Sequence, residues 1–118
     1  MVNNRKKGAE YEIRAAEYLK EQGLQIIEMN FSLRSGEIDI ICLDDNTYVF
    51  VEVKYRKNNS YGFPYEAVTY KKQATICRVA TLYMKIKKLP VNGSFRFDVI
   101  SILDKEITWY KNAFYYHV

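Results

Sequence analysis

The chain has 118 residues, 48% of them apolar and 27% charged, which is typical of one globular domain and excludes a disordered or collagen-like chain. A formal net charge of +4 suits a polyanionic partner, although many proteins without such a partner are equally basic. Two cysteines are too few for the disulfide framework of a small secreted protein.

Membrane and secretory signals are missing from the sequence pattern. No apolar run approaches the roughly 20 residues that span a bilayer, and MVNNRKKGAE is followed by no apolar segment of the signal-peptide type. We therefore expect a cytoplasmic protein with Cys42 and Cys77 as free thiols. We expect neither a membrane nor a nucleotide cofactor among its partners.

The predicted elements follow the order α-β-β-β-α-β-β in one domain over residues 1–118. The first helix ends at Gly23, and the second begins after the loop NNSYGFP with Thr69 as its N-cap. This order indicates an α/β domain with a mixed β-sheet flanked by helices. The helices are expected at residues 7–22 and 69–87, and the strands at residues 24–31, 37–43, 48–57, 95–103 and 107–110.

The predicted hairpin of residues 37–57 carries charges among apolar residues. With the shortest turn, antiparallel pairing places Asp39 opposite Glu52, and Glu37 opposite Lys54. Directly opposed carboxylates repel, and a divalent cation between them would remove that penalty. A lysine beside such a site can orient a water or stabilise charge on a phosphate. The alternatives are a solvated face with an ordinary Glu37–Lys54 ion pair, or a longer loop with another register.

Glu12 lies at the centre of the apolar stripe of the first predicted helix, between Ala15 and Leu19 on one side and Ala9 and Ala16 on the other. A carboxylate facing a core is costly unless it is paired or bound to metal. It could instead be an acid near a helix N-terminus, stabilised by the helix dipole. We expect the helix to lie over the sheet and bring Glu12 to the hairpin acids.

Glu12, GEIDII (residues 36–41) and VEVK (residues 51–54) together resemble the active-site pattern of the PD-(D/E)XK nuclease superfamily. From about Gly8 to Phe114 the chain resembles more closely the YraN-like family, itself similar to archaeal Holliday-junction resolvases. Tyr11 stands where that family usually has glycine. The supporting segments are AAEYLKEQG, VFVEVKYR, EAVTYKK, RFDVI and NAF.

The resemblance implies a restriction-endonuclease-like fold with a metal-dependent catalytic site. Glu12, Asp39 and Glu52 would hold Mg²⁺ or Mn²⁺, and Lys54 would complete the catalytic set. The family also tends to have a basic residue early in the second helix, here Lys72. Resolvase-like relatives work as dimers, so the resemblance also allows a homodimer.

Basic and polar residues that follow the hairpin and open the second helix are the candidate nucleic-acid contacts. Charged residues at a helix start are usually solvated, but here Lys72 and Gln73 flank the apolar face and could reach toward a phosphate. Contacts to phosphate give an affinity that falls with salt and carry little sequence information. The candidates are Arg56, Lys57, Lys71, Lys72 and Gln73.

Three features near the C-terminus have mainly structural interpretations. Asp98, which alternates with apolar neighbours, is expected to pair with Arg96 or a backbone group. His117 is expected to be a frayed surface residue. The aromatic segment TWYKNAFYYHV either closes the core or packs against a second subunit.

The leading hypothesis is a metal-dependent DNA endonuclease that hydrolyses phosphodiester bonds, with branched or junction DNA as the substrate that the resemblance suggests. One alternative is a nucleic-acid-binding module that keeps the fold without cutting. Another is a protein-interaction domain that uses the aromatic C-terminal segment.

Overall fold

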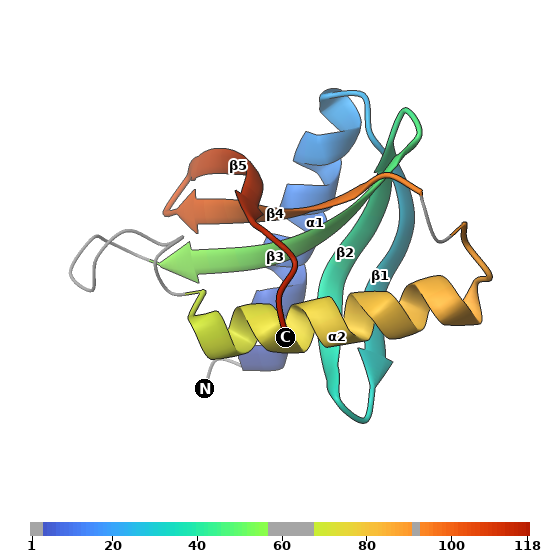
Figure 1. The fold of residues 1–118 in the computed structure, drawn as a ribbon. Helices are drawn as coiled ribbons and strands as arrows, with labels where there is room; N and C mark the ends of the chain where they lie inside the picture. Colours follow the sequence, from blue (N-terminus) through green and yellow to red (C-terminus); the bar gives the residue numbers. More distant parts are fainter. Residues whose placement is uncertain (1–3, 57–67, 91–92) are drawn as a thin grey trace.

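A five-stranded sheet lies between two helices in the computed structural model, which describes residues 4–56, 68–90 and 93–118 and side chains from residue 8 onward (Figure 1). The strands lie in the order β1-β2-β3-β4-β5, and only β3 and β4 are parallel. The predicted fold class and element order are therefore confirmed. The elements are α1 (Asn4–Glu21), β1 (Gln25–Leu33), β2 (Gly36–Asp44), β3 (Thr47–Arg56), α2 (Tyr70–Ile86), β4 (Phe95–Leu103) and β5 (Glu106–Phe114).

The helix ends follow from local chemistry. Gly23 has a φ of 96°, a left-handed conformation that glycine adopts without strain, and the Leu24 N–H donates to the Leu19 carbonyl at 3.0 Å to close α1. At the start of α2, Thr69 Oγ1 accepts from the Lys72 N–H at 3.1 Å. The predicted N-cap is confirmed. No helix in the described ranges is long and apolar enough to cross a membrane.

Each face of the sheet buries its own core. On one face, α1 packs Ala15 and Leu19 against Val49 and Val51 of β3. On the other face, α2 packs against a core that contains Phe50 of β3. Neighbouring β3 residues thus serve opposite cores, as the alternation of strand side chains requires. Helix α2 forms the crossover from β3 to the parallel strand β4, and it covers the face of the sheet opposite to α1 (Figure 1).

The last strand is longer than the predicted residues 107–110. The pairing register shifts between Phe97 and Val99 of β4, where the facing segment of β5 is longer and contains Asn112 at a φ of 52°, and β5 continues to Phe114. The prediction ended too early because the polar residues after Tyr110 interrupt the apolar pattern.

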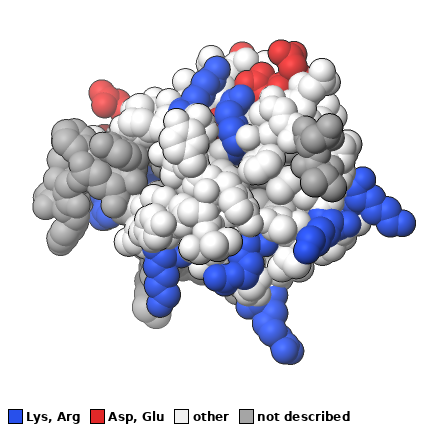
Figure 2. Space-filling model, viewed as in Figure 1, with Lys and Arg blue, Asp and Glu red and all other residues white. Residues whose placement is uncertain are grey.

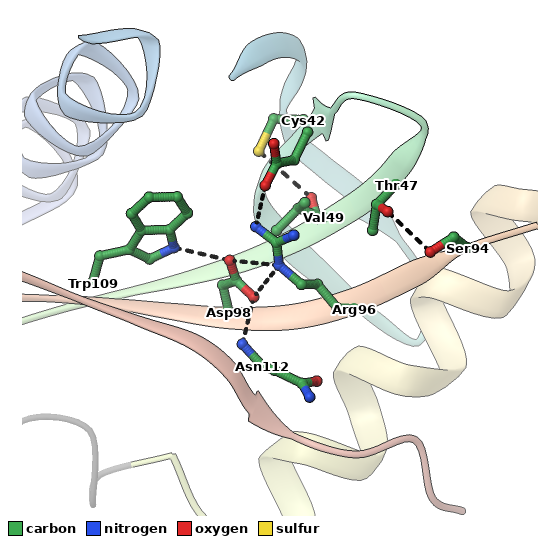
Figure 3. Close-up of polar contacts among 9 residues, drawn as sticks. Cys42, Thr47, Val49, Ser94, Arg96, Asp98, Trp109 and Asn112 are labelled. Carbon is green, nitrogen blue, oxygen red and sulfur yellow. Dashed lines mark hydrogen bonds and ion pairs between the residues drawn. The ribbon is translucent and has the colours of Figure 1, made fainter. Parts of the chain in front are cut away.

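Asp98, at this register shift, is fully buried and accepts hydrogen bonds from three donor groups (Figure 3). Its donors are Arg96 Nε at 3.0 Å, Trp109 Nε1 at 2.8 Å and the Asn112 N–H at 2.8 Å. Arg96 also forms an ion pair with Asp44 of β2 at 3.0 Å. The structural interpretation of Asp98 is confirmed, because its partners join β4 to β5 and, through Arg96, to β2.

The C-terminal residues lie across α2 (Figure 1). The His117 ring stacks on Tyr70, with centroids 3.9 Å apart, and its Nε2 is 3.1 Å from Gln73 Oε1. The interpretation of His117 as a frayed surface residue was wrong. Proximity to the chain end does not prevent order when an aromatic partner and a hydrogen-bonding amide lie on the neighbouring helix.

Candidate acidic site

Strands β2 and β3 part at Asp39. Their pairing follows the predicted register from Asp44↔Thr47 to Ile40↔Val51. One step further, the Val53 N–H donates to Asp39 Oδ2 at 2.8 Å. The Asp39 side chain therefore replaces a backbone acceptor, and the strict Asp39–Glu52 ladder pair that the sequence predicted is not formed. Both carboxylates are nonetheless buried, with 7% and 5% exposure.

The same strand changes face at this point. Ile38 packs in the core beneath α2, whereas Ile40 packs in the core beneath α1. Residues two apart on a regular strand share one face, so β2 rotates about its axis at Asp39. The neighbouring strand does the same, because Phe31 packs beneath α2 and Met29 beneath α1. Asp39 therefore lies where groups from both faces of the sheet can reach it.

Glu12 reaches Asp39 from α1. Burial, followed by the negative charge of Asp39, raises the pKa of Glu12 from 4.5 to about 7. Glu37 adds to this rise, and a hydrogen bond from the Asn30 side chain opposes it. Glu12 thus faces the hairpin acids, as its position on the apolar stripe predicted.

Glu52 reaches Asp39 from β3, on the α2 side of the sheet. Burial, a hydrogen bond with Asp39 and the charge of Asp39 raise the pKa of Glu52 from 4.5 to about 9. The positive charges of Lys72 and Lys54 act in the opposite direction. Lys72 Nζ lies 3.7 Å from Glu52 Oε2, a buried oxygen with no hydrogen-bond partner. Four elements thus contribute to one cluster.

The donor set suits a hard divalent cation, which prefers carboxylate oxygens. Glu52 Oε2 is a buried acceptor that such an ion would satisfy. Among the residues that the structure describes, no three His, Cys, Asp or Glu side chains are already arranged as a metal site. The acids interact pairwise through Asp39, which affects both Glu12 and Glu52.

Of the predicted nucleic-acid contacts, Lys72 is the one that the structure places directly beside this cluster. Lys71 is exposed, and Lys72 is partly exposed beside Glu52. Gln73 donates to the Val68 carbonyl at 3.1 Å and also contacts His117. Arg56 is half-buried at the end of β3. Lys57 lies outside the described residues.

Sequence reasoning missed two features of the site. Asn30 of β1 lowers the pKa of Glu12, and its φ of 55° identifies a left-handed residue inside a strand. The available signal was the residue type, because asparagine tolerates a left-handed backbone better than most residues. The second is Tyr11, which stacks on Tyr55 with centroids 4.1 Å apart and so joins α1 to the end of β3. This contact accounts for a large residue immediately before Glu12.

Removing the ionisable group of Glu52 should weaken the pH dependence of the free energy of unfolding, measured without metal. Because its folded-state pKa is raised, the folded chain binds more protons than the unfolded chain between about pH 4.5 and pH 9. Stability should therefore fall as pH rises through this window, by up to about 1.4 kcal/mol per pH unit for one proton. Glu52→Gln should reduce that slope in urea unfolding with EDTA present. An unchanged slope, with exposed Glu17→Gln as the control, would contradict the raised pKa.

The fold and this cluster define an α/β domain with a largely buried carboxylate site where two strands part. A model of the family described as "Uncharacterised protein family UPF0102" matches residues 11–102, a range that contains Glu12, Asp39, Glu52 and Lys54. The chain belongs to this YraN-like family, which confirms the family resemblance seen in the sequence.

Relatives from distant bacteria match the chain over nearly its full length. It is 46% identical to the UPF0102 protein of Lachnoclostridium phytofermentans over 113 residues, which cover 96% of each chain. It is 44% identical to the UPF0102 proteins of Photobacterium profundum and Vibrio cholerae, each over 115 residues. These alignments cover 95% of this chain and 92% and 94% of the two relatives.

Proposed function

We propose that this chain is a metal-dependent DNA endonuclease of the PD-(D/E)XK superfamily, which hydrolyses phosphodiester bonds with Mg²⁺ or Mn²⁺. The observation that carries the proposal is the meeting of Glu12 and Glu52 at Asp39, from opposite faces of the sheet. Folding alone gains nothing from three neighbouring carboxylates, since like charges in a buried site repel. A shared cation would offset that cost.

The carboxylates would hold the cation, and the lysines would act on the phosphate. When bound, the cation would polarise the phosphate and lower the pKa of a bound water. Lys54 lies two residues after Glu52, on the same side of β3 by alternation, and its charge already acts on Glu52. Its ammonium would orient the attacking water or stabilise charge on the phosphate. Lys72, beside Glu52, would do the same from α2.

Helix α2 supports DNA as the substrate. Among its residues Tyr70–Ile86 there is no Asp or Glu, whereas Lys71, Lys72, Arg78 and Lys85 carry positive charge. Figure 2 shows Lys and Arg side chains over the lower part of the face that carries α2, with acids toward its upper edge. Such a surface attracts a phosphate backbone without reading its sequence. The resemblance to Holliday-junction resolvases supplies the finer proposal of branched DNA, cut by a homodimer with two sites.

The test is purified protein incubated with linear, flapped and four-way DNA at low salt, with Mg²⁺, Mn²⁺ or EDTA. We expect cleavage only with metal and preferentially of the branched substrates. Salt-sensitive binding without cleavage under any metal would replace this proposal with the non-cleaving nucleic-acid-binding module.

A further inference from the structure

We propose that Tyr11 and Tyr55 form a stacking platform beside the acidic cluster, on which an unpaired nucleobase of a DNA substrate lies. This inference rests on the proposed function and deepens it, because it names the part of a branched DNA that the protein would hold. The observation that carries it is an aromatic stack built from the chain neighbours of Glu12 and Lys54.

The two rings are held against each other and beside a cation. The ring centroids of Tyr11 and Tyr55 are 4.1 Å apart, and the ring planes are 10° from parallel. The guanidinium carbon of Arg14 lies 5.4 Å from the Tyr11 centroid. Nη1 and Nη2 of Arg14 donate to the carbonyls of Asp104 and Lys105, in the β4–β5 turn, at 3.4 Å each. Contacts from α1, β3 and the β4–β5 turn therefore order the stacking platform.

Part of the stacking platform remains open to solvent. Tyr55 is 36% exposed, although Tyr11 covers one face of its ring. A tyrosine that only joins a helix to the sheet can be buried between them, as Tyr83 of α2 is, with 2% exposure against Phe50 of β3. A nucleobase can stack on an exposed aromatic ring, and a ring that is already ordered loses little entropy when the base binds.

The stacking platform lies within a few nucleotides of the acidic cluster. Tyr55 follows Glu52 by three residues on β3. At about 3.3 Å per residue this separation is about 10 Å, or about three base steps along a DNA strand. Tyr11 directly precedes Glu12 on α1. A strand with one phosphate at the carboxylates could therefore place a nearby base on Tyr55.

The state of the DNA decides whether such a base is available. Inside a duplex both faces of each base are covered by its neighbours, so a protein ring reaches a face only after the base is unstacked. A flap or a frayed branch point offers unpaired bases with a free face. Arg14 and Lys54, next to the stacking platform, add the positive charge that attracts the backbone of the same segment. We therefore expect a preference for DNA with an unpaired segment over continuous duplex.

The experiment is fluorescence anisotropy with a labelled single strand, its duplex, and a duplex that carries the same strand as a flap, in EDTA to prevent metal-dependent cleavage. Tyr55→Ala and Tyr55→Leu should weaken binding of the flap and the single strand by about 5-fold to 150-fold, the usual effect of removing a ring that stacks on a base. Binding of the duplex should not change. Tyr55→Phe should bind all probes like wild type, because it keeps the ring.

Two comparisons separate stacking from packing and from charge. Tyr115→Ala removes a tyrosine that is 76% exposed in the C-terminal segment, and it should bind like wild type. Tyr55→Ala should keep the wild-type slope of log affinity against log salt, whereas Lys71→Ala should reduce that slope by about one and weaken binding of every probe. Circular dichroism checks folding, and Tyr55→Leu keeps an apolar side chain against Tyr11 if Tyr55→Ala does not fold.

The possible results differ in what they remove. Wild-type binding of the flap by folded Tyr55→Leu would show that Tyr55 serves packing alone and would overturn the stacking platform. An equal loss for flap and duplex would also overturn it, because a paired base has no free face. Neither result affects the metal site of the proposed function. A selective loss of flap binding, in a protein that cleaves no DNA with any metal, would support the stacking platform and remove the endonuclease activity. No DNA binding by wild type would overturn both.

Discussion

Replacing Asp39 with asparagine should reduce metal-dependent DNA cleavage by at least about 1,000-fold, the effect of losing roughly 4 kcal/mol of transition-state stabilisation. Asp39 is the residue that both Glu12 and Glu52 meet, so its charge is the one least replaceable in holding a cation. Asparagine keeps an oxygen that can accept from the Val53 N–H, so the strand junction should survive. Cleavage of a four-way junction at saturating Mn²⁺ measures the loss.

Two controls separate the charge of Asp39 from its structural role. Asp45→Asn changes an exposed acid in the β2–β3 turn and should leave cleavage at the wild-type rate. Asp39→Ala also removes the acceptor of the Val53 N–H, so it should lower stability as well as activity. Cleavage retained by a folded Asp39→Asn variant would remove Asp39 from the catalytic site.

Replacing Asp98 with alanine should destabilise the protein by about 3–5 kcal/mol, the usual cost of removing one partner of a buried ion pair. The substitution leaves the Trp109 Nε1–H and the Asn112 N–H without their acceptor and removes a buried counter-ion of Arg96. Because small domains have only about 5–15 kcal/mol of stability, the loss should be large in urea unfolding.

Asp44→Ala removes the other carboxylate partner of Arg96, which is more exposed than Asp98. The Asp44 side chain is 29% exposed, so its 3.0 Å ion pair with Arg96 should be worth about 1 kcal/mol or less. Equal losses for Asp98→Ala and Asp44→Ala would contradict the assignment of the stabilisation to the buried carboxylate.

Much of the fold could be predicted because each signal was local. Turn chemistry fixed the β2–β3 register from Asp44↔Thr47 to Ile40↔Val51, and capping residues fixed the helix ends within a few residues. Glu12 was found because a carboxylate that faces a core destabilises the fold unless it is paired or bound to metal.

The site geometry could not be predicted because it depends on a departure from regular structure. Alternation assumes a straight strand, whereas β2 rotates at Asp39 and leaves β3 there. The pairing rules therefore predicted correctly that Asp39 and Glu52 lie close together. They also predicted a directly opposed ladder pair, which is not formed. Asn30 was missed for the same reason, since a left-handed residue within β1 is itself a departure from regular strand geometry.

The stacking of His117 on Tyr70 has a practical consequence for work with this protein. His117 contacts Tyr70 and Gln73 in the first turn of α2, the turn that also carries Lys72. A truncation that removes His117 would take the Tyr70 stacking and the Gln73 contact away from the helix beside the acidic cluster.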